Sequence, residues 1–267
     1  MEGTHSPRLV ALLFEHAPVQ SRAAILQLAV ENLDGEVAAD PPEDDEIGIV
    51  FHPAHRVELL DVVTTAATAL GGPDAAQRER WAAFVPHSRR CRDAAGRLRT
   101  CTTQIVLTEL FSRALPRAER HELFVRVVET LTAKLAPTLV VSAPTQEILD
   151  PVRLAGEPGM LLANTRLFRV GDSDRDLVMD TVGLAVLGLP DLQVRFTGLD
   201  PGDMAAFLYD VADYLYEHGD VIEDGHTIEG IRPATAWRCR HATSSVGPRR
   251  PVIDIDPGRP YAVGNRG

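Results

Sequence analysis

The chain has 267 residues, of which 45% are hydrophobic and 24% charged, so it is globular in composition and wholesale disorder is excluded. Acidic residues outnumber basic ones 38 to 27, which gives a formal net charge of −11. A net-acidic chain has no overall attraction to nucleic-acid backbones or anionic lipid, so we expect neither as a partner. The 26 arginines against one lysine, Lys134, are typical of the coding bias of a high-GC bacterium such as an actinobacterium.

Cysteine usage and hydropathy predict a soluble, cytoplasmic protein. Cys91, Cys101 and Cys239 have no paired spacing, which argues against a disulfide framework and fits a reducing compartment. The apolar run from Leu9 to Phe14 is too short for a signal peptide, and no run approaches the roughly 18 residues of a transmembrane helix.

Residues 1–87 are interpreted as an N-terminal β-α-β half. The apolar run Leu9–Phe14 predicts a strand, and Ser21 is a suitable cap for a helix that extends to about Leu33. An acidic loop, Asp40–Glu46, precedes a β-rich stretch. Further helices are expected in two segments, at residues 61–70 and 74–84.

Residues 88–100 carry five arginines against one aspartate and are interpreted as an Arg-rich, mobile loop between two halves. Such a loop can lie in solvent, dock on the acidic surface of its own chain, or bind an acidic partner. It lacks the interleaved aromatic residues of nucleic-acid-binding segments. A second basic segment follows Gly230 and contains seven arginines and two aspartates.

Residues 101–256 are expected to form a second α+β half, and residues 257–267 a flexible tail. Two helices are predicted, at Arg117–Leu135 and from a cap at Asp200 to about His218. A further short helix is expected at residues 146–154, and the remaining segments predict strands at 102–107, 138–141, 167–170, 177–182, 192–196, 227–229, 237–241 and 252–255. The fold class is therefore α+β, with a mixed, largely antiparallel sheet and helices on one face. Two similar β-α-β halves are one interpretation of this order.

The sequence contains no phosphate loop, no GxGxxG and no GxSxG, so no nucleotide cofactor is expected. His52 and His55 are candidate metal ligands, although zinc would need further ligands from elsewhere. Alternatively, the two residues are surface histidines or histidines that form ordinary hydrogen bonds.

The C-terminal region holds the candidate catalytic residues. Four carboxylates lie within ten residues, at Asp220, Glu223, Asp224 and Glu229. We assign His226, Glu229 and His241 as base, acid and orienting group of a possible active site. A solvated hairpin at Asp224-Gly225 is the alternative. Three nearby tyrosines suit either a ligand surface or the edge of the core: Tyr209, Tyr214 and Tyr216.

Residues 100–242 resemble the bacterial domain-of-unknown-function family 4261. The resemblance rests on Thr181-Val-Gly-Leu184, Leu187-Gly-Leu-Pro-Asp191, a helix that ends in Tyr-Leu-Tyr-Glu-His-Gly219, and an Asp224-Gly225 turn. It implies an α+β domain and no activity. In this motif Asp191 is expected to cap or close a tight turn, so the motif predicts architecture rather than an active site.

Two functions follow from these observations. The first is a non-enzymatic protein-binding or accessory module that uses the Arg-rich loop or the acidic surface. The second is a small-molecule tailoring enzyme or hydrolase that uses the C-terminal histidines and carboxylates. The oligomeric state does not follow from the sequence.

Overall fold

The computed structural model describes residues 8–20, 22–30, 35–37, 49–53, 65–70, 72–109, 115–154, 158–171 and 173–264. The chain divides into two compact units, Met1–Leu161 and Leu162–Gly267. The expected division at residues 88–100 therefore differs from the observed one, which falls between two consecutive leucines. Within the described residues, no helix is both long and apolar enough to cross a membrane.

The first unit is built on one antiparallel sheet with the strand order β2-β3-β4-β5-β1-β6-β7. Its strands are β1 (Leu9–Phe14), β2 (Gly35–Val37), β3 (Ile49–Pro53), β4 (Thr65–Leu70), β5 (Thr103–Thr108), β6 (Leu139–Ser142) and β7 (Glu147–Leu149). Its helices are α1 (Arg22–Val30), α2 (Ala75–Ala82), α3 (Ala94–Thr100), α4 (Arg117–Leu135) and α5 (Pro151–Leu154), with short 3-10 turns η1 (Val85–His87) and η3 (Pro158–Leu161).

Helices cover both faces of this sheet, which corrects the expectation of helices on one face. Alternate residues of β1 point to opposite sides, so Leu12 packs in the cluster of α1 and α4, and Leu13 in the cluster of α2 and α3. The sequence of β1, LVALLF, is apolar at every position, which suits a strand buried on both faces.

The two β-α-β stretches form one sheet instead of two halves. β5 and β6 both pair with β1, and β5 separates β1 from β4. After β1, helix α1 leads to β2 at the edge of the sheet, and the strands β2, β3 and β4 run back toward β5. The unit β5-α4-β6 is a split β-α-β unit, because β1 lies between its two strands. The two stretches have a similar order of elements in the sequence, but their strands pair with one another in a single sheet.

Three predictions for this unit are wrong. Residues 65–70 form β4 instead of a helix, because they continue the sheet beside β5. Residues 147–149 form β7, and only 151–154 are helical. The Arg-rich segment contains α3, which begins at the cap Asp93 and buries Ala94 and Leu98.

The second unit is a mixed six-stranded sheet with the strand order β11-β12-β13-β10-β9-β8. Its elements are β8 (Asn164–Arg169), β9 (Asp176–Val182), η4 (Leu184–Leu187), β10 (Asp191–Thr197), α6 (Pro201–His218), β11 (Thr227–Glu229), β12 (Ala236–Thr243) and β13 (Pro251–Asp256). The pair β10–β13 is parallel and the other pairs are antiparallel, so the α+β prediction with a mixed, largely antiparallel sheet is confirmed.

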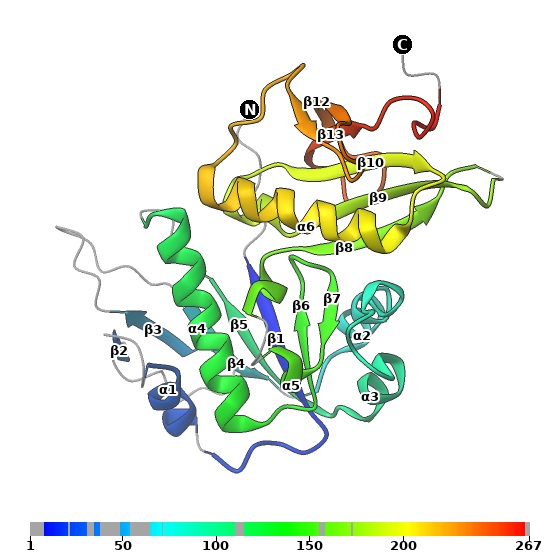
Figure 1. Ribbon diagram of the computed structural model, residues 1–267. Helices are drawn as coiled ribbons and strands as arrows, with labels where there is room; N and C mark the ends of the chain where they lie inside the picture. Colours follow the sequence, from blue (N-terminus) through cyan, green and yellow to red (C-terminus); the bar gives the residue numbers. More distant parts are fainter. Residues whose placement is uncertain are drawn as a thin grey trace. The chain divides into compact units, whose positions relative to one another are not determined.

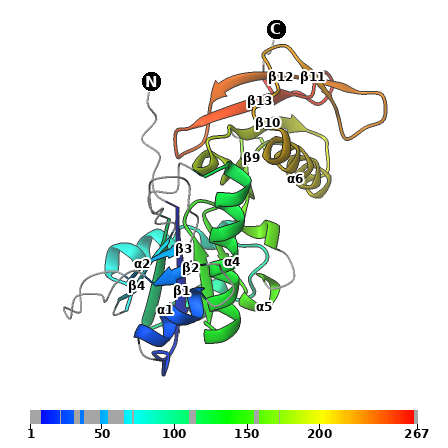
Figure 2. The same cartoon turned by 90° about the vertical axis from the view of Figure 1, so that its left-hand side faces the viewer.

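Helix α6 lies across one face of this sheet (Figures 1 and 2). Asp200 caps its first turn by accepting hydrogen bonds from the backbone N–H groups of Gly202 and Asp203, and the helix ends at Gly219, as predicted. Its apolar stripe packs on the sheet, where the ring of Phe207 contacts the indole of Trp237 edge-on, with 4.9 Å between the ring centroids.

The opposite face of the sheet buries an ionic network. Arg250 donates to Asp191 at 2.8 Å and to Asp180 at 2.7 Å, and Arg166 also donates to Asp180. Burial raises the pKa of Asp191 to about 6, although Arg250 and a hydrogen bond from the Leu184 N–H act in the other direction. As predicted, Asp191 closes the turn after β9, because it accepts hydrogen bonds from Thr181 and from the Leu184 backbone.

The expected flexible tail joins the second unit. The Thr197 N–H donates to the carbonyl of Tyr261, and Phe196 forms an isolated bridge with Ala262. Tyr261 packs against the core cluster beneath α6. Residues 257–264 are therefore held by the sheet, and residues 265–267 lie outside the described residues.

Candidate functional site

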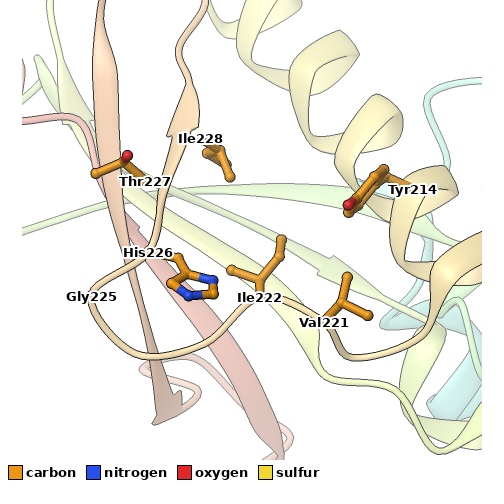
Figure 3. A pocket seen from close by; sticks show the side chains of 7 residues that line it. All are labelled: Tyr214, Val221, Ile222, Gly225, His226, Thr227 and Ile228. Atoms are coloured by element: carbon orange, nitrogen blue, oxygen red, sulfur yellow. The ribbon is translucent and has the colours of Figure 1, made fainter.

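An open hollow of about 520 Å³ lies between the end of α6, the following loop and β11. Tyr214 comes from α6, Val221, Ile222, Gly225 and His226 from the loop, and Thr227 and Ile228 from β11 (Figure 3). Tyr214 and Val221 are each 46% exposed, and they are two of the four large hydrophobic side chains that are exposed in the described structure. The hollow thus combines exposed apolar side chains with polar groups such as those of His226 and Thr227, and it is open to a ligand.

Exposed carboxylates lie on α6 and on the loop that together line this hollow, and we call them the acidic rim. Its members are Asp210, Asp213, Glu217, Asp220, Glu223 and Asp224. No arginine or lysine occurs between Asp203 and Glu229. Partial burial, with a smaller contribution from the neighbouring charges of Asp210 and Glu217, raises the pKa of Asp213 above its usual range.

His241 fixes the loop that lines the hollow. Its Nδ1 lies 3.1 Å from Asp224 Oδ1, and its Nε2 lies 3.1 Å from Asp220 Oδ1. The His241 backbone N–H also donates to Asp224, at 2.6 Å. One imidazole on β12 therefore holds the loop at two carboxylates, an arrangement that we call the His241 clamp.

The clamp favours a protonated imidazole. Partial burial alone would lower the pKa of His241, but the hydrogen bonds to Asp220 and Asp224 outweigh burial and raise it. Conversely, the backbone and side-chain hydrogen bonds from His241 lower the pKa of Asp224. Because both ring nitrogens face carboxylates, the ring has no free nitrogen to take a proton from a substrate.

His226 lies in the hollow, but its ring is also engaged. Its Nδ1 accepts a hydrogen bond from the Glu223 backbone N–H at 3.1 Å, which leaves the proton of the neutral ring on Nε2. That Nε2 lies 3.5 Å from the Glu223 carboxylate. The ring is therefore set up to donate a hydrogen bond rather than to act as a base.

Glu229 does not join the two histidines. Ile228 is paired with Trp237 on the face that α6 covers, and alternation along β12 places His241 on the same face. Glu229 is paired with Ala236 and is therefore on the opposite face. The expected base, acid and orienting group thus do not converge on one point, because neighbouring residues of a strand point to opposite sides.

The expected metal ligands are not brought into a described site. His52 lies in β3, where only the backbone is described, and His55 lies outside the described residues. Among the residues that the structure describes, no group of three or more histidine, cysteine, aspartate or glutamate side chains could hold a metal ion.

Two arginines of the Arg-rich segment form ion pairs within the first unit. Arg90 forms a bidentate pair with Glu147, whose side chain is 1% exposed, and Arg97 bonds Asp150 at 2.8 Å and the carbonyl of Thr138. Arg89, Arg92 and Arg99 are exposed. Half-buried ion pairs thus hold this segment to β7 and its flanking residues.

Sequence reasoning missed Val221 and Ile222 as components of a site, and it named Tyr214 only as one of three tyrosines that suit either a ligand surface or the edge of the core. The three tyrosines of α6 differ: Tyr209 and Tyr216 are half-buried, and Tyr214 is exposed beside the rim. The available signal was the position of Tyr214, which falls outside the apolar stripe of the helix and between acidic residues.

Comparison with known proteins finds the same family that the sequence resembles, and it assigns no function. The family described as Domain of unknown function (DUF4261) matches residues 180–256, which include the Asp191 turn, α6 and the hollow. No curated protein and no solved structure matches the chain. Residues 180–256 are therefore similar to the domain-of-unknown-function family DUF4261.

Proposed function

We propose that the protein is a non-enzymatic binding module that captures a positively charged segment of another protein at the hollow. The observation that carries this proposal is an open hollow, lined in part by the exposed side chains of Tyr214 and Val221, beside the six exposed carboxylates of the acidic rim. The three free, buried cysteines suit a reducing compartment, so we propose a cytoplasmic partner.

The partner's chemistry follows from the rim. His241 pairs with Asp220 and Asp224, but the chain has no arginine or lysine between Asp203 and Glu229, so a cationic ligand reduces the repulsion that remains among the rim carboxylates. The same field opposes phosphate backbones, which disfavours nucleic acid. An apolar side chain of the partner fills the hollow, and flanking lysine or arginine side chains face the rim.

The geometry favours binding over the alternative of a hydrolase or tailoring enzyme. Both ring nitrogens of His241 bond carboxylates, and Nδ1 of His226 accepts a backbone hydrogen bond. Burial raises the pKa of the Cys239 thiol to about 11, so it is a poor nucleophile at neutral pH. The imidazole rings that catalysis would require are therefore hydrogen-bonded within the loop region, and the Cys239 thiol is buried.

Binding of synthetic peptides tests the proposal. One library carries a central valine, isoleucine, leucine or phenylalanine between lysines and arginines, and a matched library carries glutamates in place of the basic residues. We expect binding from the basic library alone, with an affinity that falls as salt rises. Equal binding of both libraries, or binding of neither, overturns the proposal.

Two pairs of variants locate the binding surface. Glu217→Lys is expected to weaken binding about fivefold, since it turns an attraction into a repulsion; a cation near the C-terminus of α6 is otherwise favourable to the helix. Glu122→Lys, on the exposed side of α4, makes the same charge change and should have no effect. Val221→Ser should weaken binding about fivefold, and its control is Val152→Ser at another exposed valine.

A further inference from the structure

The hollow adjoins the free edge of a sheet. β11 is the terminal strand of its sheet, and β12 is its one neighbour within the described structure. Thr227 and Ile228 both belong to β11 and to the lining of the hollow. A ligand in the hollow therefore lies next to the outer edge of β11.

The hydrogen-bond alternation shows which residues face that edge. The Cys239 N–H donates to the His226 carbonyl, and the Gly230 N–H donates to the Thr235 carbonyl. These bonds lie two residues on either side of Ile228, so Ile228 directs its own backbone groups toward Trp237. Thr227 and Glu229 consequently direct their N–H and C=O groups outward, where both residues are exposed.

We infer that the cationic segment binds as an extended strand added to β11, and that it pairs with the backbone of Thr227 and Glu229. This inference rests on the proposed function and specifies its binding mode. The partner residue beside Ile228 points to the face covered by α6 and places its side chain in the hollow. The residue beside Glu229 points to the other face, where the Glu229 carboxylate selects lysine or arginine.

Charge decides which strand can occupy the edge. A second copy of this chain would bring its own Glu229 and its own acidic rim against the first, and like charges across a strand pair are destabilising. Exposed edges are commonly protected from self-pairing by charge. The acids of this edge oppose a second copy and attract a cationic strand.

Backbone methylation of a binding peptide tests the pairing. We expect N-methylation at the alternate amides that face Thr227 and Glu229 to weaken binding by about tenfold each, and the intervening amides to tolerate it. On the protein, hydrogen exchange of the Thr227 and Glu229 amides should slow on binding. The Ile228 amide, already directed toward β12, serves as the internal control.

The outcomes separate this inference from the proposed function. A basic peptide that binds with a flat methylation profile and leaves Thr227 and Glu229 unprotected overturns strand addition and leaves the binding module standing. Absence of binding by every basic peptide overturns both. Protection of Thr227 in a dimer seen by sedimentation, without peptide, makes a second copy the occupant and overturns the cationic partner.

Discussion

The basic segment 88–100 and the acidic segment 203–229 carry opposite charges, and the fold uses them differently. The first unit uses the basic side chains internally, since Arg90 and Arg97 bond Glu147 and Asp150. The acidic segment contains no arginine or lysine, and its carboxylates are exposed beside the hollow, although His241 pairs with two of them, Asp220 and Asp224. The difference teaches that a run of charge marks a partner surface only where the rest of the chain leaves most of that charge unpaired.

The C-terminal basic segment extends the comparison. Arg250 is buried between Asp180 and Asp191, and Arg240 bonds the buried carboxylate of Asp254 at 3.1 Å. These arginines neutralise carboxylates on the face of the sheet opposite α6. Acidic residues of the same domain are thus either paired in the interior or left exposed at the rim.

The largest expected effect is at Arg250. Arg250→Ala should lower the free energy of unfolding of the second unit by about 4 kcal/mol, because it leaves two buried carboxylates without this partner. Arg249→Ala, at an exposed neighbour, should change it by less than about 0.5 kcal/mol. Urea unfolding followed by Trp237 fluorescence in a Trp81→Phe background measures both. Equal effects of the two variants would contradict an internal role for Arg250.

The second effect is at Arg90. Arg90→Ala should destabilise the first unit by about 3 kcal/mol, since the buried Glu147 carboxylate loses a bidentate donor. Arg92→Ala removes an exposed arginine and should be close to neutral. Urea unfolding followed by Trp81 fluorescence in a Trp237→Phe background compares them. A neutral Arg90→Ala would mean that this segment is held to β7 by other contacts.

The third effect concerns the pH range over which the His241 clamp holds. The folded pKa of His241 is raised above 6.5, so its stabilisation is present below pH 6.5 and is lost as the pH rises through the folded value. The pKa of Asp224 is lowered below 3.8, so its stabilisation is present above pH 3.8 and is lost as the pH falls through the folded value.

An NMR titration of the His241 ring checks this window. We expect a midpoint above the ordinary value in the native chain and a lower midpoint in Asp220→Asn, which keeps the shape of the side chain and removes its charge. The Gly225 and His226 amides should exchange faster on either side of the window. A midpoint that does not change in Asp220→Asn would rule out the clamp.

The smallest effect tests the basic segment as a binding surface. Arg92→Glu and Arg99→Glu reverse exposed charges of the segment 88–100. Each should leave the affinity for a basic peptide within about twofold, because the proposed surface is in the acidic segment. Fluorescence anisotropy with a labelled peptide measures this. A larger loss in either variant would return the segment to the candidate binding surfaces.

Local patterns predicted the elements that local forces dominate. α4 has the predicted bounds Arg117–Leu135 because its apolar stripe has helical spacing, and α6 begins at Asp200 and ends at Gly219 because a cap and a stop flank its stripe. Predictions failed where a neighbouring strand decided the conformation. Residues 65–70 are alanine-rich and helical in composition, but pairing with β5 makes them a strand.

The candidate site was predictable in part. The sequence pointed to the region of His226 and His241, and in the structure His241 contacts Asp220 and Asp224, a pairing that the sequence analysis did not predict. That Glu229 lies on the other face depends on the register of β11 against β12, which the spacing of residues does not show. The exposure of Tyr214 and Val221 depends on how the loop folds back to β12.

The sequence by itself determined an acidic α+β chain, its long helices and its family motif, because composition, caps and periodicity act over a few residues. The tertiary structure alone decided which charges are exposed. Arg250 meets Asp180 and Asp191 across a separation of about 60 to 70 residues, and Arg90 meets Glu147 across 57. Such pairs form only when strands distant in sequence become neighbours, and the charge left over after pairing defines the proposed binding surface.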